Sequence, residues 1–183
     1  MENQTKPINK SMSVVSGKLP VDFSNLAYER LQPQAINLEE AVLGAVMLDK
    51  DAISIAMEIL RPESFYKSAH ATIFKVMIKL FDLSQPVDLL TVSEQLRKAE
   101  ELENVGGLPY ILELSNKVTS SANVEYYARI VAQKYIQREL IRVSTLIIKD
   151  SFEDTKDVLD MLDQAEQNLY EITDKNLRRG YES

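Results

Sequence analysis

The chain has 183 residues, no cysteine, a single histidine and a formal net charge of −7. The lack of cysteine excludes disulfides, thiol nucleophiles and Cys-ligated metals, and one histidine leaves almost no room for a His-pair metal site. The five glycines form neither a dinucleotide-binding fingerprint nor a P-loop, so no backbone cradle for phosphate is expected. An acidic domain is a poor DNA ligand by itself, because phosphate contacts need lysine and arginine. Composition therefore favours a helical protein-interaction module over an enzyme.

Residues 1–33 are predicted to be a flexible N-terminal tail, because they hold three of the six prolines and show no sustained apolar periodicity. A short helix near Ser24–Leu31 is compatible with the sequence. The start of the chain lacks the apolar core of a signal peptide, and no apolar stretch approaches the ~20 residues of a membrane-spanning helix. We therefore expect a cytoplasmic protein without membrane contact.

Residues 34–120 are predicted to form a compact head of several short helices. Asn37 is expected to cap the first helix, with Glu40 as the third residue of a capping box. Ser68 is expected to cap the third helix, and Thr91 with Glu94 the fourth. Apolar spacing and turn residues place the helices at about 37–48, 52–60, 69–83, 91–100 and from 109 onward.

Gly44 lies inside the first predicted helix, where glycine costs about 1 kcal/mol relative to alanine. Close approach of another helix at this position would explain the glycine, and so would chance.

Residues 121–174 are predicted to form a long antiparallel helical hairpin. Ser120 or Ser121 is expected to cap a helix that runs to about Lys149, and a five-residue connector leads to a last helix over Thr155–Asp174. The first helix carries net positive charge and the second net negative charge, so the cations are expected to pair with the acidic partner helix. In the last helix, apolar residues follow steps of 4, 3, 4 and 3, which is a coiled-coil seam made of Val158, Leu162, Ala165, Leu169 and Ile172.

The hairpin has apolar residues on more than one side, although a single stripe suffices to join its two helices. The remaining apolar positions are expected to pack on the head or on another chain. These candidate interface residues are Ile130, Ile141, Ile148, Leu159 and Met161. The fold class predicted by the whole pattern is all-α, with a compact multi-helix globular head followed by a long antiparallel helical hairpin.

Few residues are candidates for chemistry. His70 is interpreted as a structural or surface residue, and the Glu39–Glu40 pair as capping and solvated charge; catalysis by these residues is the minor alternative. Tyr127 and Tyr135 lie among basic residues and either belong to the hairpin core or stack nucleic-acid bases; the core interpretation is favoured. No catalytic, cofactor-binding or metal-binding residue is assigned.

Five segments in register resemble the N-terminal domain of bacterial replicative DNA helicases of the DnaB type. Each motif alone is weak, but all five follow one another in the family's order. They are LQPQAINLEEAVLGAVMLD at 31–49, SFYKSAHATIF at 64–74, PVDLLTV at 86–92, VGGLPYIL at 105–112 and NVEYYARIV at 123–131.

The resemblance implies a part of a larger enzyme. Family members continue through a linker, which residues 175–183 would begin, into a RecA-like domain that binds ATP and Mg and drives DNA unwinding. The hairpins pair between subunits, giving dimers or a hexameric collar built as a trimer of dimers. The domain docks the C-terminal domain of primase, helicase loaders are further partners, and DNA is held mainly elsewhere. The alternative is a stand-alone helical adaptor or helicase-loading protein that shares the fold; a P-loop encoded beyond Ser183 would argue against it.

Overall fold

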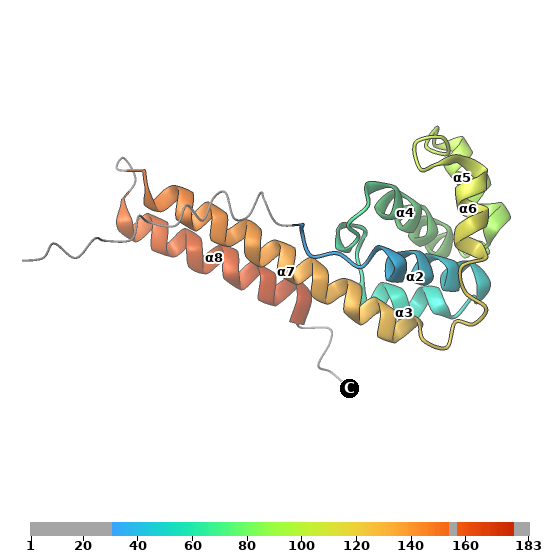
Figure 1. Cartoon of the computed structure of the whole chain (residues 1–183), viewed down its shortest axis with the longest axis horizontal. Coiled ribbons are helices and arrows are strands. Elements are labelled where there is room, and N and C mark those ends of the chain that lie inside the picture. Colours follow the sequence, from blue (N-terminus) through green and yellow to red (C-terminus); the bar gives the residue numbers. More distant parts are fainter. Residues whose placement is uncertain (1–30, 154–156, 178–183) are drawn as a thin grey trace, which may run out of the picture.

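The computed structural model describes residues 31–153 and 157–177, with side chains up to residue 174. Within these ranges the fold is all-α, and a globular head is followed by a long antiparallel hairpin, which confirms the predicted fold class (Figure 1). The helices are α2 (Ile36–Leu48), α3 (Ala52–Ile59), the short 3₁₀ helix η1 (Pro62–Ser64), α4 (Ser68–Asp82), α5 (Leu89–Lys98), α6 (Gly107–Ser115), α7 (Val124–Ser151) and α8 (Val158–Leu177).

Two sequence predictions lie largely outside the described residues, namely the tail at 1–33 with its short helix and the linker at 175–183. Among the helices that are described, none is both long enough and apolar enough to cross a membrane.

Helix α2 is the central element of the head. Every residue from Glu39 to Met47 is buried, because α3, α4, α6 and α7 surround the helix. A helix covered on all sides needs apolar residues around its whole circumference, which explains why its sequence lacks a clear polar face. The core that surrounds it includes the fully buried side chains of Leu43, Ile73, Phe74 and Ile111.

Gly44 lies where α2 meets α6. A Cβ atom built on this glycine would overlap the backbone carbonyl oxygen of Leu114 and would also touch Val118. The close approach of another helix, rather than chance, therefore explains this glycine.

The predicted helix caps are wrong at three positions. Asn37 lies inside α2, which begins at Ile36, and Ser68 is the first residue of α4 rather than its cap. Helix α5 is capped by Asp88, whose carboxylate accepts hydrogen bonds from the backbone of Leu90 and Thr91, both at 2.9 Å. Asp88 is the first side chain after Pro86 that can accept hydrogen bonds from the free N–H groups of a helix start. Helix α5 therefore begins just after Asp88, three residues before the predicted cap at Thr91.

The cap of the long helix also differs from the prediction. Helix α7 begins at Val124 after Asn123. The Ser121 hydroxyl instead donates to the Asp49 carboxylate at 2.6 Å, so it ties the α6–α7 loop to the turn between α2 and α3.

Helix α7 is shared between head and hairpin, and Arg138 lies at the transition. The first turns of α7 contribute Val124, Ala128 and Val131 to the head core, whereas the later turns lie along α8 (Figure 1). The Arg138 guanidinium donates to the carbonyl of Pro33 at 2.8 Å and to that of Ser64 at 2.7 Å. Two charge-assisted bonds to fixed backbone therefore hold the hairpin to the head at this point.

We expect Gly44→Val to destabilise the chain by about 2 kcal/mol, because the added methyl groups have to displace the Leu114 backbone. Urea denaturation monitored by circular dichroism would measure the loss. Ser54→Ala, at an exposed position of α3, is the control and should change stability by less than about 0.5 kcal/mol. Equal stability of the valine variant and the control would contradict the tight α2–α6 contact.

Candidate protein interface

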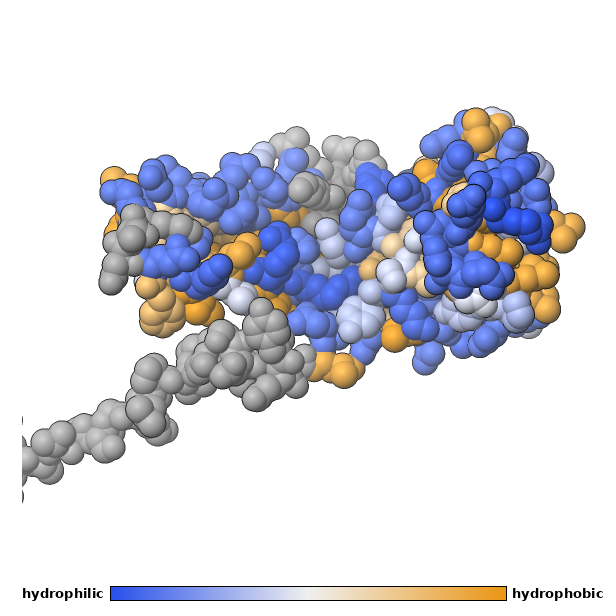
Figure 2. Space-filling view, turned by 90° about the horizontal axis from the view of Figure 1, so that it is seen from above, coloured by the Kyte–Doolittle hydropathy of each residue, from blue (hydrophilic) through white to orange (hydrophobic). Residues whose placement is uncertain are grey.

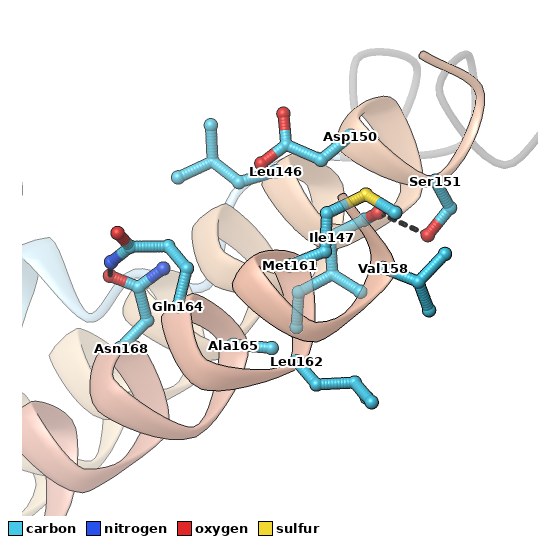
Figure 3. A pocket seen from close by; sticks show the side chains of 10 residues that line it. All are labelled: Leu146, Ile147, Asp150, Ser151, Val158, Met161, Leu162, Gln164, Ala165 and Asn168. Atoms are coloured by element: carbon cyan, nitrogen blue, oxygen red, sulfur yellow. Dashed lines mark hydrogen bonds between the residues drawn. The ribbon is translucent and has the colours of Figure 1, made fainter. Parts of the chain in front are cut away.

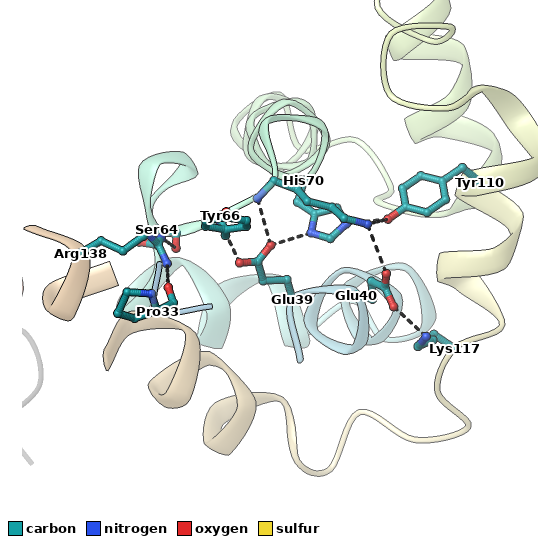
Figure 4. A network of polar contacts seen from close by, with 10 residues as sticks. Pro33, Glu39, Glu40, Ser64, Tyr66, His70, Tyr110, Lys117 and Arg138 are labelled. Atoms are coloured by element: carbon teal, nitrogen blue, oxygen red, sulfur yellow. Dashed lines mark hydrogen bonds and ion pairs between the residues drawn. The ribbon is translucent and has the colours of Figure 1, made fainter. Parts of the chain in front are cut away.

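The Glu39–Glu40 pair is buried, so its interpretation as capping and solvated charge is wrong. The Glu39 carboxylate accepts hydrogen bonds from the backbone N–H groups of Tyr66 at 2.7 Å and Lys67 at 3.4 Å (Figure 4). It also lies 2.7 Å from Nδ1 of His70. A buried carboxylate needs such partners, and here they come from the corner between η1 and α4. Helical periodicity gives no sign of this role. The one available signal in the sequence was chemical: two carboxylates stand within an apolar helix, and the single histidine is a suitable partner for one of them.

His70 is fully buried and links three helices. Its Nε2 lies 2.6 Å from the hydroxyl of Tyr110 in α6, while Nδ1 faces Glu39 in α2. Burial, together with the negative charges of Glu40 and Glu113, raises the pKa of Tyr110 to about 12, so this hydroxyl keeps its proton and can donate to the ring. Both ring nitrogens are engaged in these contacts and the ring is buried. This agrees with the interpretation of His70 as a structural residue.

Glu40 completes the polar network at the edge of the head. Its carboxylate lies 2.7 Å from the ammonium of Lys117 and 3.7 Å from that of Lys67. Burial by itself would raise the pKa of Glu40, but the hydrogen bond and charge of Lys117 outweigh it, so the net effect lowers this pKa. The pair anchors the segment after α6 to the central helix.

The hairpin has an extensive apolar surface that the described residues do not cover. Figure 2 shows hydrophobic side chains interrupting the hydrophilic surface near the outer end of the hairpin, away from the head. The exposed fraction is 83% for Phe152, 70% for Leu159, 64% for Val158 and 62% for Leu162. Large apolar side chains gathered in this way mark an interaction surface more often than a free monomer surface.

Only part of the apolar seam predicted on α8 packs against α7. Ile172 is buried and Ala165 half-buried, but Val158, Leu162 and Leu169 remain exposed. Met161, Ala165, Asn168 and Ile172 are the more buried positions, so the inward face is rotated relative to the predicted seam. The apolar stripe of α8 is therefore wider than one partner helix covers.

The five predicted interface residues fall into two groups. Leu159 is exposed on α8, and Met161 lines a groove between α7 and α8. Ile130, Ile141 and Ile148 are half-buried on α7, where spacings of 11 and 7 residues place them on one face. Phe152, which lies in the connector and is not among the predicted interface residues, is the most exposed apolar residue in the described part of the hairpin.

Arg129 and Arg142 form close ion pairs within α7, whereas the prediction places such pairs across the hairpin; Glu171 of α8 also attracts Arg142 electrostatically. Arg129 bonds Glu125 and Arg142 bonds Glu139, both within α7, and Arg138 binds backbone carbonyls. A partner three or four residues away is always within reach on a helix, whereas a partner on the facing helix requires the right register. Tyr127 packs against the head core, whereas Tyr126 is exposed.

The groove between the outer halves of α7 and α8 is shown in Figure 3, with the side chains of both helices around it. Its walls are apolar, and polar groups form its rim. The lining residues are Leu146, Ile147, Asp150, Ser151, Val158, Met161, Leu162, Gln164, Ala165 and Asn168.

Comparison with known proteins gives consistent matches. Residues 31–133 match the family described as "DnaB-like helicase N terminal domain". The replicative DNA helicase DnaB of Geobacillus stearothermophilus is 48% identical over 155 residues, which is 84% of this chain and 34% of that relative. DnaB of Rhodothermus marinus is 44% identical over 154 residues, which is 84% of this chain and 16% of that relative. The chain thus spans about a third or less of the length of these curated relatives.

Two solved structures share the fold. The crystal structure of the N-terminal domain of DnaB helicase from Mycobacterium tuberculosis has a TM-score of 0.74 and 34% sequence identity, and covers 77% of this chain and 99% of its own. A structure of a DnaB-like replicative helicase and its interactions with primase has a TM-score of 0.62 and 27% identity, and covers 75% of this chain and 31% of its own.

The Glu40–Lys117 pair should make stability depend on pH in acid. A carboxyl whose pKa is lower in the folded chain stabilises it above the unfolded pKa, and this contribution is lost as the pH falls through the folded pKa. We therefore expect Lys117→Met to be less stable than the wild type at pH 7, with the difference shrinking toward pH 3. Urea midpoints at both pH values would measure it, and Lys75→Met, at an exposed position of α4, is the control. If the stability difference between Lys117→Met and the wild type did not change with pH, the lowered pKa of Glu40 in the folded chain would be contradicted.

Proposed function

This chain belongs to the family of DnaB-like helicase N-terminal domains, and from that premise we propose that it joins subunits of a replicative DNA helicase and docks primase. The proposed assembly is a dimer, or a hexameric collar built as a trimer of dimers. ATP and Mg would bind in the part of the helicase that the chain does not include, and that part would also provide the main grip on DNA and the unwinding activity. Helicase loaders are further candidate partners.

The exposed apolar stripe of the hairpin is the observation that carries the proposal. Val158, Leu162 and Leu169 form one side of α8 that α7 leaves uncovered, and Leu159 adds to it. Burying an apolar side chain of this size stabilises an interface by about 1.5–3 kcal/mol relative to leaving it in water. A second hairpin laid along this stripe would remove most of it from solvent.

The face of α7 that holds Ile130, Ile141 and Ile148 is the second proposed contact, as is Met161. Their partial burial leaves apolar area for a neighbour, but it also means that a charge placed there can unfold the monomer. Leu159 and Leu162 are therefore the sharper test positions, because most of each side chain is in solvent in the single chain.

We expect Leu159→Asp and Leu162→Asp to weaken self-association at least about tenfold, since each places a charge in the proposed contact. Sedimentation equilibrium over a wide range of concentrations would measure the dissociation constant. Gln167→Asp introduces the same charge at another exposed position of α8 and should leave association within about twofold of the wild type. A wild-type chain that stays monomeric at all concentrations, or equal constants for all three variants, would contradict the pairing surface.

Primase docking rests on the likeness to the helicase whose structure includes its interactions with primase. We expect the C-terminal domain of primase to bind the assembled form of this chain, with heat released in titration calorimetry. Leu159→Asp should lower the fraction of chains that bind if docking requires paired subunits. No heat at any concentration at which the chain is assembled would contradict docking, but it would leave pairing intact.

A further inference from the structure

The groove between α7 and α8 is suited to single side chains rather than to a whole helix. Its volume is about 140 Å³, and Ile147, Met161 and Ala165 are among the residues that line it. A buried apolar cavity of about 150 Å³ holds one benzene molecule. The groove therefore has room for one or two aliphatic side chains, which an extended segment can insert without bringing a helix into contact.

The described chain begins beside the middle of α7, within reach of this groove. The carbonyl of Pro33 is held by Arg138, and Ile147 lies nine residues further along α7, a rise of about 14 Å (Figure 1). Pro33 lies fifteen positions after Lys18, and an extended segment of this length can span up to about 50 Å. The N-terminal segment therefore reaches the groove with slack, and its tether gives it an effective concentration in the millimolar range.

The chemistry of this segment complements the groove and its surroundings. Residues 3–21 contain Lys6, Lys10 and Lys18 and no acidic residue, and the apolar residues Met12, Val14 and Val15 lie between the last two lysines. Asp157, which precedes α8 and accepts a hydrogen bond from the Leu159 N–H, is exposed, and so are Asp160 and Asp163 in the first two turns of the helix. These acidic residues neighbour Val158 and Leu162 of the groove in the sequence. Opposite charges within about 8 Å of each other attract at physiological ionic strength.

We infer that residues 10–18 of the same chain bind in the groove between the outer halves of α7 and α8. Val14 and Val15 supply the inserted side chain, and the flanking lysines lie near the acidic turns of α8. The bound segment covers part of Val158 and Leu162. Binding of the segment does not require subunits to pair, but the groove shares Val158 and Leu162 with the proposed pairing stripe. Segment binding and subunit pairing therefore compete for part of one surface, and the binding has to be tested on the monomeric chain.

Disulfide trapping tests the inference cleanly because the chain has no cysteine of its own. In the double variant Val14→Cys, Ser151→Cys, the new thiols would lie on the bound segment and on the rim of the groove. At a concentration where the chain is monomeric, mild oxidation should join them within one chain. We expect the reaction to be about tenfold faster than in the double variant Val14→Cys, Gln167→Cys, since proximity raises the effective concentration.

Gln167 is a demanding control position. It is exposed and lies on α8, which runs back toward the head, so it is nearer to Pro33 along the hairpin than Ser151 is. A segment that does not bind the groove would therefore meet Gln167→Cys at least as often as Ser151→Cys. Equal trapping rates, or disulfides formed only between two chains, would overturn the inference. Adding Lys10→Glu and Lys18→Glu should slow trapping at Ser151→Cys several-fold.

A measurement without engineered thiols guards against variants that disturb the fold. Hydrogen exchange of residues 146–151 and 158–168 should be faster in the Lys10→Glu, Lys18→Glu variant than in the wild type. Exchange in α2, which lies in the head core, is the internal reference and should not change. Unchanged protection of both hairpin segments in this variant would overturn the inference.

Discussion

The buried carboxylate of Glu39 is the interaction on which the rest of the structure depends. It sits on a central helix that is covered on all sides, so its hydrogen-bond partners have to come from within the head. The backbone of Tyr66 and the ring of His70 meet this need. The corner between η1 and α4 is thereby fixed against α2, and α6 is added through Tyr110.

The same corner sets the direction of the hairpin. Arg138 binds the carbonyl of Ser64, and its guanidinium lies over the rings of Tyr66 and Tyr135, 5.6 and 5.7 Å from their centroids. Burial lowers the pKa of Arg138, but its usual value is so high that the side chain stays charged. A chain of contacts thus runs from Glu39 through the η1–α4 corner to α7. The head fixes the angle at which the hairpin presents its apolar surface.

The head and the hairpin differ in how completely their side chains are packed. The head satisfies its buried charges internally, whereas the hairpin leaves Phe152, Val158, Leu159 and Leu162 exposed. Two helices can cover only one stripe of each other, so a wider apolar stripe requires a further partner. A compact head joined to a hairpin with uncovered apolar residues fits the proposed role in assembly. The proposed binding of the N-terminal segment would cover part of this apolar surface in the single chain.

The sequence by itself determined the helical class, the order of head and hairpin and the surplus of apolar residues, because helical spacing and turn residues are local signals. Its motifs also identified the family. Only the tertiary structure decided that Glu39, Glu40 and His70 share one network, since residues 31 positions apart meet only when helices pack. It also moved the caps to Asp88 and Asn123 and rotated the inward face of α8. Several side chains can cap each helix, and α8 can turn different faces toward α7. Packing between segments decides among these alternatives, so no single segment encodes the outcome.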